Sequence, residues 1–191
     1  MKPLNQYIKE KLIINKDYRD TTIVVKSFDE LRKIIEDRYD KLGPGTKQDP
    51  INFNDIDVSN IYSFSNDKGK GIFERTKFKY IDISDWDVSN AIDMSYMFFK
   101  CNELESVGDI SDWDVSNINS MRGMFFMCKE LKSVGDISKW NVSNVTNMTH
   151  MFNGCNNFNQ DISEWNVSNV RHHTYMFDKC KIKDEYKPKF K

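Results

Sequence analysis

Four aspartates recur along the sequence at a spacing that could bring their carboxylates together. They are Asp82, Asp109, Asp136 and Asp161, and the intervals between them are 27, 27 and 25 residues. Aligned carboxylates at strand spacing repel one another, so they need backbone N–H groups, nearby serine hydroxyls or a cation. Calcium takes about six to eight oxygen ligands, and the glycine-rich calcium repeat is absent. We therefore expect local capping of turns, with a bound cation as the open alternative.

Four cysteines recur at the same intervals: Cys101, Cys128, Cys155 and Cys180. No two of them form a Cys-x-x-Cys pair, the spacing typical of zinc sites, so we expect buried, reduced thiols. The sequence has only 3 histidines and no Ser-His-Asp constellation, phosphate-binding loop or His-Glu-x-x-His motif. We therefore predict that the protein is not an enzyme and has no catalytic residue, metal or cofactor.

A tandem repeat accounts for this spacing. The tryptophans follow the same intervals, and a phrase beginning Asp-Ile-Ser leads into each of them. Every phrase continues to a Met-Phe pair, with a cysteine three residues after the phenylalanine. A degenerate copy comes first, with Ile56 in place of the tryptophan, which makes about four and a half repeats. The tryptophans are Trp86, Trp113, Trp140 and Trp165.

Repeats of this length predict a solenoid, in which each unit buries its apolar face against its neighbours. Apolar residues between Val115 and Cys128 recur every three or four positions, which is helical spacing, and Ser116 and Asn117 stand at an N-cap position. The stretch 131–137 is compatible with one strand. We therefore expect an α/β solenoid: a leucine-rich-repeat-like right-handed superhelix of short parallel strands and short helical segments, with an N-terminal α/β cap.

The repeat phrase resembles a known family. Residues 136–160 read Asp-Ile-Ser-Lys-Trp-Asn-Val-Ser-Asn-Val-Thr-Asn-Met-Thr-His-Met-Phe-Asn-Gly-Cys-Asn-Asn-Phe-Asn-Gln. This is similar to the BspA-like leucine-rich repeat, in the version catalogued as a mycoplasma surface-lipoprotein repeat of unknown function, over roughly residues 52–180. The resemblance implies a curved solenoid used for protein–protein contact, often as a surface adhesin, and no catalytic residue. The chain departs from those surface proteins in showing no signal peptide or lipobox cysteine.

The segment before the repeats predicts an α/β cap. Positions 4–13 favour a short helix, and Thr21–Val25 is rich in β-branched residues, as strands are. Ser27 and Glu30 form a capping box that opens a second helix, and Gly43 ends it. The apolar residues of that helix are Leu31, Ile34, Ile35 and Leu42. The expected parts are a capping segment with linker at 1–50, repeats at 51–180 and a Lys-rich tail at 181–191.

Several repeated positions are predicted to be structural. The tryptophan, cysteine and Met-Phe columns are expected in the core, with each indole N–H bonded locally. A column of asparagines is expected to bond backbone groups of neighbouring coils. The alternative for the tryptophans is an exposed stripe that binds sugars or peptides. The asparagines are Asn90, Asn117, Asn144 and Asn169.

The positions on either side of each tryptophan change between repeats, and we predict that they bind a partner. Variable exposed residues on a rigid scaffold are where recognition usually lies. Before the tryptophans these residues are Asp85, Asp112, Lys139 and Glu164, and after them Asp87, Asp114, Asn141 and Asn166. The sequence does not name the protein partner, and self-association is a further alternative.

Charge and hydropathy bear on partners and location. Residues 81–180 carry 7 basic and 14 acidic side chains, which argues against a nucleic-acid groove. No apolar run approaches the roughly 18 residues of a membrane-spanning helix, and Met1–Tyr7 has no apolar signal core. We therefore predict a cytoplasmic protein, or a virion-associated one if a phage encodes it.

Three functions are consistent with this sequence. We favour a non-enzymatic protein–protein interaction module that binds a host or virion protein. The first alternative is a structural or packaged phage virion component docked through residues 1–16, which weakly resemble leader segments on proteins of tailed phages. The second is a cell-surface adhesin that binds glycans through the tryptophans.

Overall fold

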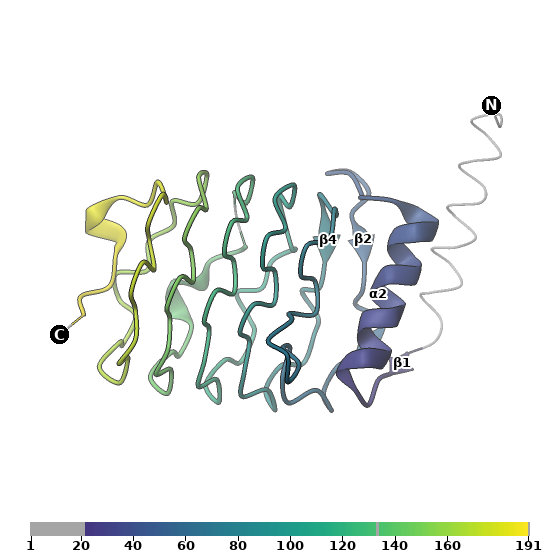
Figure 1. Cartoon of the computed structure of the whole chain (residues 1–191), viewed down its shortest axis with the longest axis horizontal. Coiled ribbons are helices and arrows are strands. Elements are labelled where there is room, and N and C mark those ends of the chain that lie inside the picture. The colour runs from purple at the N-terminus through teal and green to yellow at the C-terminus, as the bar shows by residue number, and fades with distance from the viewer. Residues whose placement is uncertain (1–21, 133, 191) are drawn as a thin grey trace.

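The computed structural model describes residues 22–132 and 134–190 (Figure 1). Its α-helix, α2, spans Phe28–Leu42, and 3₁₀ helices span Ile137–Lys139 and Asp184–Tyr186. The strands are β1 (Ile23–Val24), β2 (Ile51–Asn52), β3 (Ile56–Asp57) and β4 (Ile81–Asp82). β1 pairs in parallel with β3, and β2 pairs in parallel with β4, in two separate sheets. The helix predicted at positions 4–13 lies outside the described residues.

The predicted α/β solenoid, a leucine-rich-repeat-like right-handed superhelix, is wrong. That fold needs a strand and a helical segment in every repeat. In the part of the chain that the structure describes, the single α-helix is α2, which precedes the repeats. The strands are two residues long and form two small two-stranded sheets. Most of each repeat consists of turns, so its helix and strand content is too low for a leucine-rich-repeat superhelix.

Tight turns replace the helix that was expected in each repeat. The N–H of Met124 donates to the carbonyl of Met121, three residues earlier, at 3.2 Å. A bond over three residues closes a turn, whereas an α-helix bonds over four. Gly123 and Met127 have φ values of 58° and 60°, which a right-handed helix does not allow. A chain of turns also places apolar residues three or four apart, so the two structures share one sequence pattern.

Between these turns, alternate N–H groups bond the next repeat. The N–H of Met121 donates to the carbonyl of Asn147 at 2.9 Å, and that of Phe125 donates to Met151 at 3.0 Å. We call the corresponding stretches the ladder segments; they are residues 94–100, 121–127, 148–154 and 173–179. All backbone bonds between described ladder segments run from an N–H to a carbonyl of the following repeat. The ladder therefore has a direction, with donors facing the C-terminal end and acceptors facing the N-terminal end.

Consecutive repeats lie side by side (Figure 1). Parallel bridges join equivalent residues, such as Asp93 with Ser120 and Ser120 with Asn147. The core rings of Phe98 and Phe125 stack with their centroids 5.2 Å apart. Each repeat is therefore covered by its neighbours, which is how segments with so little helix or strand acquire a core.

The strand expected at residues 131–137 is also absent from the described part of that stretch. Ile137 instead begins a 3₁₀ helix, and the Asp136 side chain caps it by accepting from the N–H of Ser138. The neighbouring repeat still bonds here, because the N–H of Ile110 donates to the carbonyl of Val134 at 2.9 Å. Single inter-repeat bonds thus take the place of a continuous strand.

The helix predicted after Ser27 is confirmed. The Ser27 side chain accepts from the N–H of Glu30, as in a capping box, and Gly43 follows the last helical residue with a φ of 75°. Leu31 and Ile35 are fully buried, so this face of α2 covers the first repeat. The predicted strand before the helix is found as β1 in its described part.

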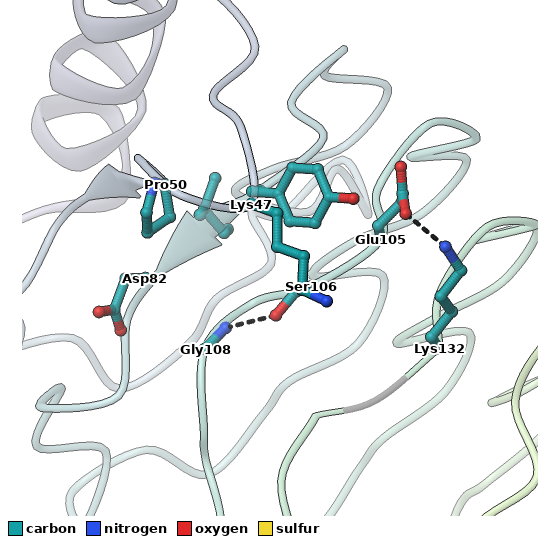
Figure 2. A pocket seen from close by; sticks show the side chains of 9 residues that line it. Lys47, Pro50, Asp82, Glu105, Ser106, Gly108 and Lys132 are labelled. Atoms are coloured by element: carbon teal, nitrogen blue, oxygen red, sulfur yellow. Dashed lines mark hydrogen bonds and ion pairs between the residues drawn. The ribbon is translucent and has the colours of Figure 1, made fainter.

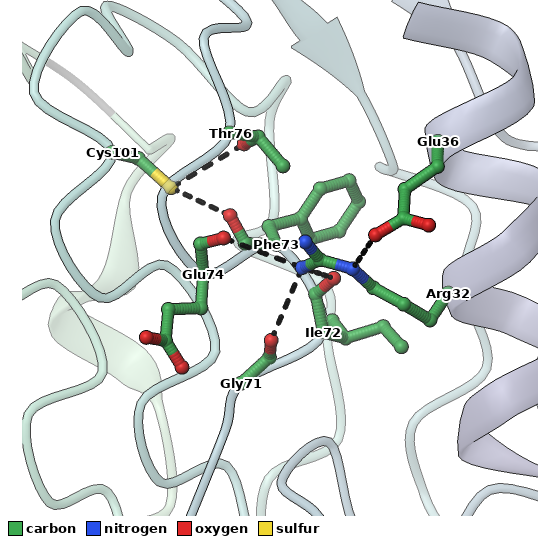
Figure 3. Close-up of polar contacts among 8 residues, drawn as sticks. All are labelled: Arg32, Glu36, Gly71, Ile72, Phe73, Glu74, Thr76 and Cys101. Carbon is green, nitrogen blue, oxygen red and sulfur yellow. Dashed lines mark hydrogen bonds and ion pairs between the residues drawn. The ribbon is translucent and has the colours of Figure 1, made fainter.

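Two arginines attach α2 to the first repeat. Arg38, which is 1% exposed, donates two 2.6 Å hydrogen bonds to the Asp55 carboxylate. Arg32 donates to the carbonyls of Ile72 at 2.7 Å and Glu74 at 3.3 Å (Figure 3). In the next repeat, the equivalent carbonyls accept ladder bonds. The Arg32 guanidinium therefore donates to carbonyls that would otherwise accept from the N–H groups of a preceding repeat.

Candidate interaction surface

The eight residues predicted to bind a partner are all exposed. We call them the Trp-flanking columns, one before and one after each tryptophan. The tryptophans between the columns are only 3–4% exposed. The first column is Asp85, Asp112, Lys139 and Glu164, and the second is Asp87, Asp114, Asn141 and Asn166. Each repeat thus presents two variable side chains, one on each side of a buried indole.

The column after the tryptophans also shapes the chain. Oδ1 of Asp114 accepts from the N–H of Ser116 at 3.0 Å, and Oδ1 of Asn141 accepts from Ser143 at 3.3 Å. These are Asx turns, which either residue type can form. Hydrogen bonds from the Ser116 side chain and backbone lower the pKa of Asp114, because they favour the charged carboxylate. Variation in this column is therefore limited to Asp and Asn.

The column before the tryptophans has no such structural constraint. Within residues 22–132 and 134–190, the side chains of its members, which are Asp85, Asp112, Lys139 and Glu164, make no hydrogen bond, although the backbone N–H of Asp85 donates to Oδ1 of Asn54 at 3.0 Å. Acidic and basic residues both occur in it. Because its side chains can change without loss of an internal side-chain hydrogen bond, this column is the better candidate for determining partner specificity.

The tryptophans hold neighbouring repeats together. Nε1–H of Trp140 donates to the carbonyl of Ile110 at 3.0 Å, and that of Trp113 donates to Ile83 at 3.3 Å. The Trp113 and Trp140 rings are parallel, with centroids 6.4 Å apart. The prediction of core tryptophans with bonded N–H groups is confirmed. Their buried faces are not accessible to a sugar.

The cysteine column is buried at three of its four positions. Cys101, Cys128 and Cys155 are buried, Cys180 is half-buried, and all four are free thiols. The Cys128 thiol donates to the carbonyl of Phe98 at 3.0 Å. Burial raises the pKa of Cys128 and Cys155 well above that of an ordinary thiol. A thiol held in its protonated form is a poor nucleophile, so Cys128 and Cys155 are packing residues.

The asparagine column ties each repeat to the one before it, as predicted. Nδ2 of Asn117 donates to the carbonyl of Ser89 at 2.8 Å, and Nδ2 of Asn144 donates to Ser116 at 2.7 Å. The four members, Asn90, Asn117, Asn144 and Asn169, all make this contact. Although the asparagines are exposed, their amides serve the structure.

The aspartate column is capped locally, which was the favoured prediction. Oδ1 of Asp109 accepts from the N–H of Ser111 at 3.1 Å, and Asp161 accepts from Ser163 at 3.0 Å. Hydrogen bonds from the backbone and side chain of Ser163 lower the pKa of Asp161. Across the described ranges, no group of three His, Cys, Asp or Glu residues is placed to hold a metal ion.

A second set of aromatic residues, half-buried except for the exposed Tyr175, was not predicted from the sequence. The Phe99 and Phe126 rings stack with centroids 4.9 Å apart, and those of His150 and Tyr175 are 5.3 Å apart. With Tyr96, which contacts Phe99 edge-on at 5.4 Å, these residues form what we call the outer aromatic row. The signal was present in the sequence, because Tyr96, His150 and Tyr175 occupy the same position in three of the four repeats, with Gly123 at that position in the other. The row was missed because a helix was expected over these residues.

A cavity of about 320 Å³ lies beside β4 and the following repeats (Figure 2). Nζ of Lys132 is 2.6 Å from the Glu105 carboxylate, and the Tyr80 hydroxyl donates to the same group. The bonds from Lys132 and Tyr80 lower the pKa of Glu105, while the bond to Glu105 raises the pKa of Tyr80. The carboxylate is thus ionised and engaged, and the phenol is protonated. The cluster links neighbouring repeats and offers no activated group.

The repeats, with their shared columns of residues, define a tandem-repeat protein. The chain belongs to the family described as "Mycoplasma protein of unknown function, DUF285", whose model matches residues 48–135 and 66–188. No curated protein and no solved structure matches the chain. Across the described ranges, every helix is too short or too polar to span a membrane.

Proposed function

We propose that the repeats form a non-enzymatic protein–protein interaction module whose contact surface is the Trp-flanking columns. The observation that carries this proposal is the exposure of all eight variable residues above a buried tryptophan column. Because the buried tryptophans hold the repeats together, the exposed recognition residues can change while the fold stays the same. The resemblance to BspA-like repeats, taken without their leucine-rich-repeat fold, supports the same function.

The charge of this surface favours a basic partner. Five of its eight residues are acidic: Asp85, Asp87, Asp112, Asp114 and Glu164. The surrounding residues 81–180 also carry twice as many acidic as basic side chains. A field of one sign speeds the encounter with a partner of opposite charge. We therefore propose a protein with a basic patch as the partner, and not a nucleic acid.

Affinity capture from a bacterial lysate would test this function. The variant carries Asp85→Lys, Asp112→Lys and Glu164→Lys, and we expect it to lose a protein that the wild type captures. The matched control carries Asp40→Lys, Asp67→Lys and Glu103→Lys, which change the net charge equally at exposed positions away from the columns. Loss of the captured protein in both variants would show that overall charge, and not this surface, drives binding.

The same experiment separates the alternatives. A captured protein that survives the triple substitution but is lost on deleting residues 1–16 would favour a virion component docked through that segment, which lies outside the described residues. A glycan-binding adhesin would need a surface other than the tryptophan faces, because these are buried. The cytoplasmic or virion-associated location stays a prediction.

A further inference from the structure

The last ladder segment carries a row of unbonded donors. In each internal segment, the first, third, fifth and seventh N–H groups donate to the following repeat. In residues 173–179, no described repeat follows, and these four N–H groups make no hydrogen bond to any described residue. We call them the edge amides; they belong to His173, Tyr175, Phe177 and Lys179. Three of these residues are exposed, and Phe177 is half-buried.

The tail covers a different part of this end. The N–H of Ile162 donates to the carbonyl of Tyr186 at 3.0 Å, so the tail replaces a following repeat beside the tryptophan column. Phe190 stacks on the His173 ring with centroids 4.0 Å apart, which covers the end of the core. Neither contact satisfies the edge amides. The tryptophan side of the end is thus backbone-bonded, whereas the four donors on the ladder side have no acceptor among the described residues.

The last ladder segment and the tail after it are rich in basic residues. Residues 171–190 carry 6 basic and 3 acidic side chains, and one of the acidic groups, Asp184, is engaged by Lys187 at 2.6 Å. Lys179 and Lys181 are exposed. Rows of free N–H groups attract carbonyl and carboxylate oxygens, and nearby lysines add to this attraction. The chemistry of the edge thus favours an acidic chain with free carbonyls.

A second copy of this chain cannot supply those carbonyls from its own ladder without rearrangement. Its first acceptors are the carbonyls of Ile72 and Glu74, which Arg32 of α2 already engages. α2 lies across that end (Figure 1) and is held there by the buried Arg38–Asp55 pair. Head-to-tail stacking would have to displace this helix. The favoured occupant is therefore a different protein.

We propose that the edge amides bind an acidic peptide segment of a partner protein by backbone pairing. Alternate carbonyls of the segment accept from the amides of His173, Tyr175, Phe177 and Lys179, as the next ladder segment would. Its carboxylates meet the lysines around the edge. This is the principle of strand addition, in which backbone bonds supply affinity and side chains supply specificity. The site is separate from the Trp-flanking columns and does not depend on their proposed function.

The test uses a displayed library of random linear peptides, selected on the full chain. We expect the enriched peptides to be acidic. A selected peptide should bind His173→Pro about 3–10-fold more weakly, because proline removes one edge amide. His172 is in a bridge with Asn147, so its extended backbone suits a following proline. The matched control is His173→Ala, which loses the same ring but keeps the amide and should retain binding.

Hydrogen exchange on the same samples locates the peptide. Bound peptide should slow exchange of the Tyr175 and Lys179 amides at least about tenfold, if backbone bonds form. Asp85→Lys, Asp112→Lys and Glu164→Lys together should leave this protection intact, which separates it from the Trp-flanking columns. Equal loss of binding in His173→Pro and His173→Ala, basic enriched peptides, or unprotected edge amides would overturn the proposal. Protection that grows with protein concentration alone would assign the edge to a second copy.

Discussion

The two ends of the ladder are chemically opposite, and among the described residues only the N-terminal end is closed. At the N-terminal end, acceptor carbonyls meet the Arg32 guanidinium, on a helix that the Arg38–Asp55 pair anchors. At the C-terminal end, the edge amides meet no described acceptor. The contrast follows from the direction of the ladder, because all its backbone bonds point one way. A repeat protein of this kind needs a hydrogen-bond donor to cap the carbonyls at its N-terminal end and an acceptor to cap the N–H groups at its C-terminal end.

The strongest test of this difference between the two ends is a proline substitution. It is placed at the same position of an internal ladder segment and of the last ladder segment. Met148→Pro removes an N–H that bonds His172 at 2.7 Å and empties a fully buried site. We expect it to lower the free energy of unfolding by about 5 kcal/mol. His173→Pro, at the edge, should cost less than about 1 kcal/mol. Urea unfolding measures both.

Alanine at the same two positions is the control. Met148→Ala loses the side chain but keeps the N–H, so the difference between Met148→Pro and Met148→Ala isolates the backbone contribution. His173→Ala and His173→Pro should be nearly equal in stability. If proline were as damaging at the edge as inside the array, the edge amide of His173 would have a partner and the two ends would not differ.

Removing the anchor of the N-terminal cap should have the next largest effect. Arg38→Met leaves the Asp55 carboxylate, which is 10% exposed, without its partner. We expect a loss of about 3–4 kcal/mol, since breaking one side of a buried pair strands a charge. Urea unfolding with and without Asp55→Leu checks the cause. The double variant should recover part of the loss, and a purely additive result would contradict the ion-pair explanation.

Arg32 tests the capping of the carbonyls more directly. Arg32→Met should cost about 1–2 kcal/mol, because the carbonyls of Ile72 and Glu74 lose their donor. Thermal unfolding would record this, with Arg32→Lys expected between the variant and the wild type. Glu36→Gln is the control, since Glu36 pairs with Arg32 at 2.7 Å but its side chain is 58% exposed. A large effect of Glu36→Gln would assign the stability to the surface pair.

The smallest predicted effect concerns acid stability. The folded state lowers the pKa of Asp114, so its contribution is present above the ordinary carboxyl pKa of about 3.9 and is lost as the pH falls through the lowered value. Asp114→Asn keeps the turn, as Asn141 does in the next repeat, but cannot titrate. Its urea midpoint should therefore fall less steeply on acidification. Asp112→Asn is the control, because it makes the same change of charge at an exposed carboxylate that accepts no hydrogen bond from any described residue. An equal change of profile in both variants would contradict the prediction.

The sequence was a good guide where a signal was local or repeated. The capping box at Ser27 and Glu30 located the start of α2, and the spacing of the tryptophans identified buried, bonded indoles. The aspartate and asparagine columns were also assigned the contacts they make. These residues act on their own turn or on the adjacent repeat, so their roles depend on few other residues.

The same reasoning failed where two structures share one pattern. Apolar residues three and four apart fit a helix, but they also fit successive turns with left-handed residues such as Met127 and His150. Arg38 was missed for a different reason. Nothing in the helix sequence shows that a charged residue will be buried, because its partner Asp55 lies 17 residues away. A contact between two single residues that are far apart in the sequence produces no periodic pattern by which it could be predicted.

The reactivity of the cysteine column can report how easily each repeat of the array opens. Each thiol lies at the same depth of a successive repeat, and only Cys180, at the open end, is partly accessible. A thiol reagent reacts with a buried cysteine only when its repeat opens. Labelling should therefore start at Cys180 and move inward through Cys155 and Cys128 to Cys101, so that the rates give the opening free energy of the array one repeat at a time.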